Sequence, residues 1–460
     1  MDLFPQAFIE QMRQLLGDSE WQLLATALNE SPPVSIRHNP NRKPADSALL
    51  SAPDGQVPWH PEGVYLKERP VFTLDPLFHA GAYYVQEASS MFVYEVLRQT
   101  GRLGRPLKIL DLCAAPGGKT TLLNDALNAA KGGFLTANEV MPARAAVLRE
   151  NLERWGISYA AVLGADVDKF EPFTGWFDLI LVDAPCSGEG MFRKDPDAIG
   201  EWSPANVALC TTRQSHILEV AEKILAPGGL LLYSTCTYNR SENEENFKRH
   251  IDSLGYDPVV LDIPETWGVT PSDYGYRFFP HRTRGEGFFI AAYEKGQHTE
   301  VAKMTISNGF KHLTPLPKKQ TEILKSWIDP SKAQTYWTTP SGEILAIPEN
   351  ILENLRILDP VFKNKWFGCP IGIIKGTDFI PGHALVFSDL LNPVPTLDLS
   401  REQALTFLKK ETFPVPSNAP LGWTLATYSG LSLGWIKILP NRMNNYLPPE
   451  RRIRMDVKGR

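Results

Sequence analysis

The pattern of apolar and polar positions changes twice along the chain. Residues 1–30 carry apolar side chains at helical spacing and predict an amphipathic helical region. Nine prolines disfavour helix in residues 31–76, and a helical pattern resumes over 84–97. From about residue 106 short apolar runs alternate with helical segments, whereas past residue 295 this rhythm is lost.

The middle stretch predicts a sheet with helices on both faces. Its short apolar runs are 107–112, 134–138, 160–163, 177–182, 229–234 and 288–293. Helical patterns lie between them, over 119–130, 143–155 and 207–225. Buried strands that alternate with helices form a parallel sheet, so we expect an α/β core here. The last third has short strand-like runs, turns and many aromatic residues, and it predicts one or two small α+β or β domains.

Composition narrows the class of protein. The chain has 460 residues, of which 43% are hydrophobic and 22% charged, which is typical of a globular protein and excludes a disordered, collagen-like or coiled-coil chain. Five cysteines, an odd number, do not form a disulfide framework and indicate a reducing compartment. No uncharged apolar run approaches the ~18 residues of a membrane span, and residues 1–17 lack the order of a signal peptide. We therefore expect a cytoplasmic monomer without membrane contact.

Charge is distributed unevenly. The net charge of −5 does not suggest a nucleic-acid partner. However, residues 1–295 hold 27 Lys and Arg against 38 Asp and Glu, a net −11, and residues 296–460 hold 20 against 14, a net +6. Such a difference fits ordinary variation between domains, and it also fits a basic part that meets a polyanion. Charge alone does not decide between the two.

A glycine-rich turn follows the first apolar run. The sequence Asp111-Leu-Cys-Ala-Ala-Pro-Gly-Gly-Lys-Thr120 joins a predicted strand to a helix, which is where nucleotide-like ligands bind in such folds. A phosphate-binding P-loop needs glycine where Cys113 stands, and the dinucleotide pattern fails because Gly117 and Gly118 are adjacent. The expected ligand has a ribose and a charged tail but no phosphate, which fits S-adenosyl-L-methionine.

Acidic residues follow the next two runs. Glu139 stands about 20 residues after the glycine turn, where a carboxylate can accept hydrogen bonds from ribose hydroxyls. Asp166 could reach an adenine amino group. Each acid alone is more typical of a helix cap or a surface charge, but their positions beside the glycine turn favour a cofactor site.

Two cysteines follow predicted strands that should be neighbours. Cys186 stands in Asp183-Ala-Pro-Cys-Ser-Gly188 and Cys236 in Ser234-Thr-Cys-Thr237. We expect both at the carboxyl edge of the sheet, where ligands bind. A thiolate that adds to carbon 6 of a pyrimidine makes carbon 5 nucleophilic enough to take a methyl group from a sulfonium. A carboxyl group such as Asp183 could stabilise the charge that develops on the ring.

Cysteines that merely fill buried space are the alternative interpretation for each thiol taken alone. Two cysteines at one edge, one of them directly after Asp-Ala-Pro, favour chemistry instead. For Cys210 and Cys369 we expect simple burial, and for Cys113 we expect backbone contact with the cofactor rather than thiol chemistry. No Cys/His spacing suggests a metal site.

These motifs closely resemble those of the Nop/Sun family of RNA cytosine-5 methyltransferases. Two further blocks match as well, Tyr84-Val-Gln-Glu-Ala-Ser-Ser90 and Pro280-His-Arg-Thr-Arg-Gly-Glu-Gly-Phe-Phe-Ile-Ala291. The five blocks occur in order over about residues 30–295. The resemblance implies a Rossmann-like, S-adenosylmethionine-dependent methyltransferase core with a largely parallel, seven-stranded sheet.

The resemblance also implies roles for individual residues. Cys236 would be the nucleophile, and Cys186 would assist release of the methylated base. The S-adenosyl-L-methionine site would consist of Cys113, Ala114, Ala115, Pro116, Gly117, Gly118, Lys119, Glu139, Asp166 and Asp183.

The C-terminal part is similar to the PUA-like RNA-binding end of the bacterial RsmF-type subgroup, which methylates small-subunit ribosomal RNA. The similarity rests on segments 422–426, 430–437 and 445–448. We therefore expect four parts: an N-terminal α+β, RNA-binding and helical region (1–100), the methyltransferase core (101–295), an intermediate α+β domain (296–385) and a PUA-like RNA-binding domain (386–460). The basic C-terminal part and the cluster Arg37–Lys43 would hold the phosphates of 16S ribosomal RNA or of the small ribosomal subunit.

The motifs and the charge distribution leave three functions to consider. The first is cytosine-5 methylation of ribosomal RNA, with another RNA such as tRNA as a variant. The second is methylation of a small molecule or protein, against which the paired cysteines and the basic appendage argue. The third is a non-catalytic RNA-binding or ribosome-assembly factor, against which the intact cysteines and acids argue.

Overall fold

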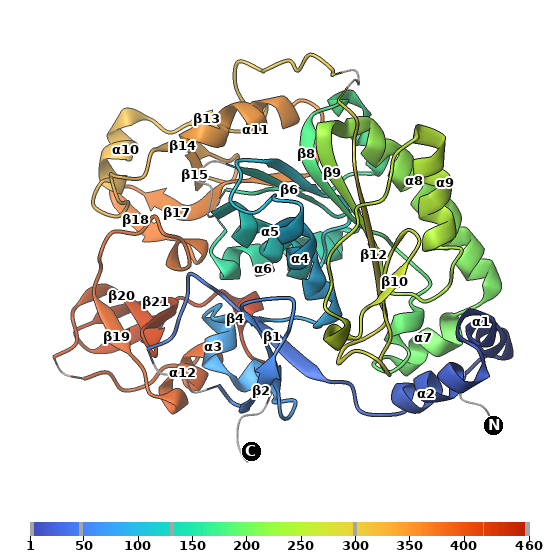
Figure 1. Ribbon diagram of the computed structural model, residues 1–460. Helices are drawn as coiled ribbons and strands as arrows, with labels where there is room; N and C mark the ends of the chain where they lie inside the picture. The colour runs from blue at the N-terminus through green and yellow to red at the C-terminus, as the bar shows by residue number, and fades with distance from the viewer. Residues whose placement is uncertain are drawn as a thin grey trace.

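The computed structural model describes residues 4–45, 49–128, 133–157, 159–297, 301–416 and 418–455. The helical expectation for residues 1–3 and 129–130 falls outside these residues. Figure 1 shows a central sheet between helices, with the N-terminal helices at one lower corner and the C-terminal strands at the other. No helix among the described residues is long and apolar enough to cross a membrane.

A nine-stranded sheet forms the centre of the molecule. From one edge to the other it runs β10 (Thr270–Ser272), β11 (Gly275–Phe278), β12 (Phe288–Glu294), β9 (Leu225–Thr235), β8 (Phe177–Asp183), β5 (Lys108–Asp111), β6 (Phe134–Asn138), β7 (Ala161–Leu163) and β16 (Lys365–Phe367). Strands β9, β8, β5, β6 and β7 are parallel, as the alternation of strands and helices predicts.

The sheet has more strands than the seven expected. A short hairpin strand, β10, lies at one edge, and β16 lies at the other. Strand β16 comes from the region after residue 295 and pairs antiparallel with β7, from Lys365↔Leu163 to Phe367↔Ala161. The edge of the methyltransferase core is therefore completed by a segment some 200 residues further along the chain.

Alternate side chains of the parallel strands face opposite helical layers. Leu179 and Leu181 of β8 pack with α4 (Val93–Gln99), α5 (Gly118–Asn128) and α6 (Pro142–Trp155). Ile180 and Val182 pack with α8 (Pro204–Ile224) and α9 (Glu244–Leu254) on the other face. Because both faces are covered, these strands are apolar throughout, which explains why the sequence shows continuous runs rather than alternation.

The N-terminal region contains two helices and a small sheet. Helices α1 (Gln6–Leu16) and α2 (Asp18–Leu28) are separated at Gly17, whose φ of 81° favours glycine. They pack beside α7 (Pro196–Glu201), as Figure 1 shows. The proline-rich stretch and the block after it form a sheet with the order β2 (Pro53–Gln56), β3 (Gly63–Leu66), β1 (Val34–His38), β4 (Tyr83–Val85), and α3 (Pro76–His79) precedes β4.

The helix expected over 84–97 is wrong in its first half. Tyr84 lies in β4, which pairs with β1, and α4 begins only at Val93 after a 3-10 turn over Ser89–Phe92. Tertiary pairing with β1 outweighs the local helical pattern here, and the β4 side chains are buried at Tyr83 and half-buried at Tyr84 and Val85.

The C-terminal third contains two small α+β units. The first is a sheet of β13 (Thr314–Pro315), β14 (Gln334–Thr338), β15 (Glu343–Pro348), β17 (Cys369–Lys375) and β18 (Asp378–Pro381), with α10 (Lys318–Leu324) and α11 (Leu352–Leu358). The second is a sheet of β19 (Thr396–Asp398), β20 (Gly422–Tyr428), β21 (Leu431–Leu439) and β22 (Arg442–Asn445), with α12 (Arg401–Leu408). The expected borders at 295/296 and 385/386 remain predictions.

Candidate active site

Two thiols lie together at the carboxyl edge of the sheet. Cys186 follows β8 and Cys236 follows β9, and these strands pair in parallel register up to Asp183↔Ser234. The two Sγ atoms are 3.1 Å apart, and both residues are partly exposed. The structure thus brings together the cysteines that the sequence placed on neighbouring strands.

The contact between the two thiols changes the acidity of Cys186. The hydrogen bond with Cys236, together with burial, raises the pKa of Cys186 above its usual value, so Cys186 keeps its proton. The Lys119 ammonium interacts electrostatically with Cys236.

A cavity of about 170 Å³ lies next to this edge and contains the predicted glycine turn. Its lining includes most of the expected cofactor residues: Cys113, Ala114, Ala115, Pro116, Gly118, Lys119 and Asp183. Gly117 stands outside the lining, but its φ of 112° is a conformation that favours glycine and shapes the turn. The other wall comes from the N-terminal region, where no cofactor residue was expected, and consists of Tyr84, Val85, Gln86, Glu87 and Ser90.

Asp183 connects the cavity to the thiols. Its Oδ2 accepts a hydrogen bond from Lys119 Nζ at 2.9 Å, and its Oδ1 accepts one from Ser234 Oγ at 2.8 Å. Burial lowers the pKa of Lys119, but the Asp183 carboxylate beside it outweighs this and holds that pKa above its ordinary value. Lys119 is therefore a cation fixed between the cavity and Cys236.

An unsatisfied carboxylate oxygen in the cavity wall fits a cationic ligand. Asp111 is 1% exposed; its Oδ2 accepts from Thr120 Oγ1 at 2.6 Å, while its Oδ1 has no hydrogen-bond partner within the described residues. Burial raises the pKa of Asp111 to about 7. An ammonium group such as that of S-adenosyl-L-methionine would satisfy Oδ1, so the cavity suits this methyl donor.

The two acids after β6 and β7 lie outside the cavity lining. Glu139 is 3% exposed; its Oε1 accepts from Met141 N at 2.9 Å, and its Oε2 pairs with Arg144 at 3.3 Å. Arg144 also donates to Ala115 O at 2.9 Å, which links Glu139 to the glycine turn. Asp166 is exposed and caps a 3-10 helix through Asp168 N, so the structure gives it the cap role that a single acid suggests.

The other cysteines have structural surroundings. Burial raises the pKa of Cys113, so its thiol stays protonated beside the cofactor turn. Cys210 in α8 and Cys369 in β17 are buried, as expected. Burial also raises the pKa of Cys210 to about 11, which leaves it an unreactive thiol.

The prediction that the cluster Arg37–Lys43 contacts phosphates is wrong for its two arginines. Arg37 is 0% exposed and forms an ion pair with Asp125. Arg42 donates to the carbonyl oxygens of Ala80 at 2.8 Å, Phe387 at 3.3 Å and Ser432 at 3.4 Å. Both guanidinium groups join parts of the fold, because main-chain and carboxylate acceptors from distant segments converge on them. Of the lysine and arginine side chains in this cluster, that of Lys43 is exposed, with 70% of it accessible.

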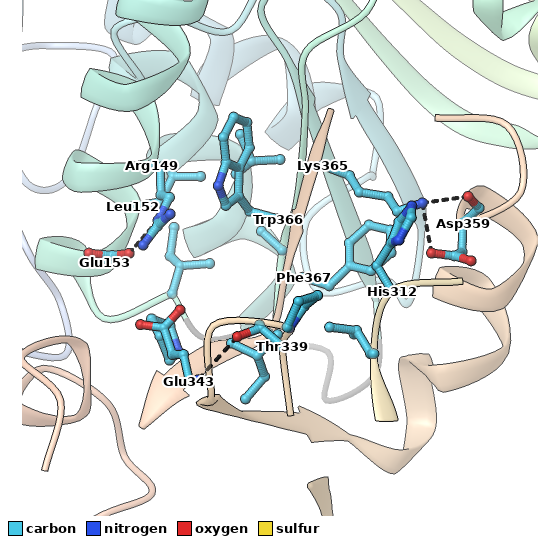
Figure 2. Close-up of a pocket in the computed structure, with 18 of the residues that line it drawn as sticks. Arg149, Leu152, Glu153, His312, Thr339, Glu343, Asp359, Lys365, Trp366 and Phe367 are labelled. Carbon is cyan, nitrogen blue, oxygen red and sulfur yellow. Dashed lines mark hydrogen bonds and ion pairs between the residues drawn. The ribbon is translucent and has the colours of Figure 1, made fainter. Parts of the chain in front are cut away.

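A second cavity, of about 350 Å³, lies between α6 and the strands after residue 312 (Figure 2). Figure 2 shows Arg149 and Glu153 on one side and Asp359, Lys365 and His312 on the other, with ion pairs on both sides. None of the described residues that line it is a cysteine or belongs to the glycine turn. This cavity therefore lies apart from the two thiols and the glycine turn.

Comparison with known proteins decides the family. The family model for "16S rRNA methyltransferase RsmB/F" matches residues 105–294, that for the N-terminal domain of RsmF matches 4–88, and that for the RsmF PUA domain matches 394–453. Ribosomal RNA small subunit methyltransferase F of Shewanella loihica is 32% identical over 415 residues, which cover 85% of this chain and 82% of that protein. The chain belongs to the RsmF family.

Other relatives agree with this assignment. The RsmF protein of Erwinia tasmaniensis is 36% identical over 308 residues, and the match spans 64% of this chain but only 63% of that relative's length. A crystal structure of a methyltransferase homologue from Pyrococcus horikoshii is 27% identical with a TM-score of 0.53 and covers 64% of this chain and 95% of that one. The crystal structure of NSun6 from the same organism, 22% identical with a TM-score of 0.53, shares the fold over 64% of this chain and 99% of that one.

The expected fold class is thereby confirmed, since the structural relative is a methyltransferase homologue with the same core and a PUA domain is matched at the C-terminus. S-adenosyl-L-methionine is the methyl donor expected of this family, and the cavity beside Lys119 and Asp183 fits it.

Proposed function

We propose that this protein methylates carbon 5 of cytosine in 16S ribosomal RNA through a covalent adduct between Cys236 and carbon 6 of the base. The observation that carries the proposal is the 3.1 Å contact between the Cys186 and Cys236 thiols beside the cofactor cavity. A methyltransferase acting on a nucleophilic nitrogen or oxygen needs no thiol, whereas carbon 5 of a pyrimidine must first be activated.

The first step needs a thiolate close to a positive charge. Cys236, hydrogen-bonded by Cys186 and near the Lys119 ammonium, forms a bond to carbon 6 of the target cytosine. The negative charge that develops on the ring is stabilised by the Lys119 ammonium, which Asp183 holds in place across 2.9 Å. A cytosine within a duplex would have to be turned out of its stack to reach this edge.

The second half of the reaction restores the aromatic ring. When bound, S-adenosyl-L-methionine would supply the methyl group of its sulfonium to carbon 5 and would leave as S-adenosylhomocysteine. A base then removes the proton from carbon 5, the electron pair re-forms the double bond to carbon 6, and the Cys236 thiolate leaves. Cys186, 3.1 Å from the departing sulfur, assists this release.

Outside the active site, the basic C-terminal part of the chain is proposed to contact the RNA. Residues 296–460 carry a net charge of +6, and their last portion matches the PUA domain of RsmF. We infer that this part holds ribosomal RNA or the small subunit while the core acts on it as a cytoplasmic monomer. The Arg37 and Arg42 side chains take no part in this contact.

The experiment uses three variants incubated with ribosomal RNA and S-adenosyl-L-methionine. Cys186→Ala should accumulate a protein–RNA adduct that survives denaturing electrophoresis, because the base is attacked but not released. Cys236→Ala should give neither adduct nor 5-methylcytosine, and the matched control Cys210→Ala should behave like the unsubstituted protein. A Cys186→Ala protein that is inactive but forms no adduct would contradict the assigned roles.

A second experiment tests the substrate. Mapping of 5-methylcytosine in cells with and without the gene should show a loss in 16S ribosomal RNA, and a loss confined to tRNA would contradict ribosomal RNA as the substrate.

A further inference from the structure

A buried carboxylate lies beneath the two cysteine loops. Glu189 is 0% exposed and stands three residues after Cys186. Its Oε2 accepts hydrogen bonds from the main-chain N–H groups of Tyr238 at 2.7 Å and Asn239 at 2.8 Å, directly after the Cys236 segment. Gly190 N also donates to Cys236 O at 2.9 Å, so the loop after β8 is tied to the loop after β9 at adjacent positions.

The other oxygen of Glu189 accepts hydrogen bonds from the Asn239 side chain and from side chains of two further segments. Its Oε1 accepts from Gln11 Nε2 at 2.8 Å, Trp202 Nε1 at 3.0 Å and Asn239 Nδ2 at 3.2 Å. Every hydrogen-bond partner of Glu189 among the described residues is an N–H group of a neutral residue, so these donors replace the water that the carboxylate loses on burial. All of these groups are donors, which means that both oxygens must act as acceptors.

A second buried carboxylate strengthens the same connection. Glu242 accepts from Ser187 N at 3.0 Å, beside Cys186, and from Asn239 Nδ2 at 2.6 Å. The Asn239 amide therefore lies within hydrogen-bonding distance of both carboxylates. The two cysteine loops are held together by a hydrogen-bond network that lies below the thiols rather than at the reacting atoms.

One donor of this network comes from the N-terminal helix. Gln11 is on α1, 178 residues before Glu189. Helix α1 is fixed there by aromatic contacts: the Phe8 ring lies 4.9 Å from that of Phe192 and 5.8 Å from that of Trp202. The helical hairpin at the start of the chain thus contacts the loop that carries Cys186.

We propose that Glu189 is a positioning residue that holds the Cys186 and Cys236 loops in their reacting arrangement, and that α1 completes this support through Gln11. The inference rests on the proposed function for its catalytic consequence, but the arrangement of the thiols can be measured without RNA. A misplacement of about 1 Å between reacting groups can lower a rate by about 10²-fold, so the support beneath the thiols affects catalysis without touching substrate.

The first test replaces Glu189 by an isosteric amide. The carboxylate has two acceptor oxygens, whereas the amide has one oxygen and one NH₂ group. In Glu189→Gln the NH₂ group therefore faces N–H donors and cannot accept their hydrogen bonds. We expect kcat for methyl transfer to fall by about 10²-fold, with the KM for RNA and the affinity for S-adenosylhomocysteine unchanged within about twofold. Glu189→Asp, which keeps both acceptors on a shorter stem, should recover part of the rate. A merely structural role would lower kcat, affinity and thermal stability together, and that pattern would overturn the proposal.

The second test reads the thiol geometry in the absence of RNA. Diamide accepts two electrons and two protons from a pair of thiols and leaves a disulfide, and the 3.1 Å contact should let Cys186 and Cys236 react rapidly. We expect disulfide formation in Glu189→Gln to be at least about tenfold slower than in the unsubstituted protein. Equal rates, or no disulfide in the unsubstituted protein, would overturn the positioning role. Because this measurement does not involve RNA, a failure of the proposed methylation would be seen separately.

The third test measures the contribution of α1. It can also be carried out if Glu189→Gln does not fold, because it leaves Glu189 unchanged. Gln11→Ala removes one donor and leaves the carboxylate in place, so both kcat and disulfide formation should fall several-fold. Gln14→Ala, an exposed position one turn further along α1, is the matched control and should change neither rate. Equal behaviour of the Gln11 and Gln14 variants would remove α1 from the proposal.

Discussion

Lys119 Nζ lies 2.9 Å from Asp183 Oδ2, so one ion pair joins the cofactor turn to the end of the strand that leads to Cys186. Only 15% of the Lys119 side chain and 32% of the Asp183 side chain are exposed. The pair is therefore partly shielded from water and counter-ions, and Lys119 provides a positive charge beside the site where the proposed reaction develops negative charge.

Asp183→Asn should retain the shape of the site but lose its charge. We expect kcat to fall by about 10²–10³-fold, because the Lys119 ammonium loses its partner and moves from its fixed position. Transfer of a labelled methyl group from S-adenosyl-L-methionine to ribosomal RNA measures this. Glu201→Gln, an exposed acid at the end of α7, is the matched control. An Asp183→Asn protein with unchanged kcat would exclude a catalytic role for the ion pair.

Arg37 is expected to support folding rather than RNA binding. Arg37→Met leaves the Asp125 carboxylate without its cation in a site where the Arg37 side chain is 0% exposed. We expect the free energy of unfolding to drop by about 3–5 kcal/mol, measured by urea denaturation. Lys43→Met, in the same segment but 70% exposed, should change it by less than about 0.5 kcal/mol. Similar small effects of both substitutions would show that the buried pair contributes little.

Asp111 should make binding of the methyl donor depend on pH. Its pKa of about 7 means that the folded protein carries a protonated carboxyl below pH 7 and a carboxylate above it. An ammonium-bearing ligand binds the carboxylate, so the affinity for S-adenosylhomocysteine should weaken by about tenfold between pH 8 and pH 6. Isothermal titration calorimetry measures this, and Asp111→Asn should bind weakly at both values.

The Asp111 carboxyl also makes the stability of the folded protein depend on pH. A rise in pH strengthens ligand binding but lowers the free energy of unfolding of the ligand-free protein. In the unfolded chain Asp111 ionises near pH ~4, so between pH ~4 and 7 the native state holds a proton that the unfolded state lacks. Its contribution therefore makes the ligand-free protein less stable as pH rises over this range. Ligand affinity that is independent of pH in the unsubstituted protein would contradict the raised pKa.

Gly190 is expected to be intolerant of a side chain. A Cβ there would lie 2.4 Å from Gly287 O and 2.9 Å from Cys236 O, so Gly190→Ala must displace the loop after Cys186 from the backbone at Gly287 and at Cys236. We expect a loss of methyl transfer of about 10²-fold or more with retained binding of S-adenosylhomocysteine. Gly200→Ala, where a Cβ meets nothing within 4 Å, should leave activity unchanged and add up to about 1 kcal/mol of stability. Full activity of Gly190→Ala would show that this loop tolerates displacement.

The parts of the fold that could be predicted are those with a local signal. The strands β5 to β9 are continuous apolar runs because both faces of the sheet are covered, and the glycine turn and both cysteine motifs end such runs. Parallel neighbours place these ends at one edge, so the proximity of Cys186 and Cys236 followed from topology alone.

The parts that could not be predicted depend on contacts between distant segments. The strand at Tyr84 forms because β1 pairs with it, although its own pattern is helical. Arg37 sits in a run of basic residues that looks like a solvated loop, and only the packed fold shows its burial against Asp125. Glu189 directly follows the motif that contains Cys186, but its partner Gln11 is 178 residues away and carries no signal of its own.

The pairing of β16 with β7 has a consequence for any attempt to divide the protein. A fragment ending near residue 295 would keep every residue of the proposed chemistry, but it would leave the main-chain N–H and C=O groups of Ala161–Leu163 open along one side of the sheet. Open strand sides of this kind associate with other chains. A shortened enzyme would therefore need either the segment around Trp366 or a charged replacement for it to stay dispersed in solution.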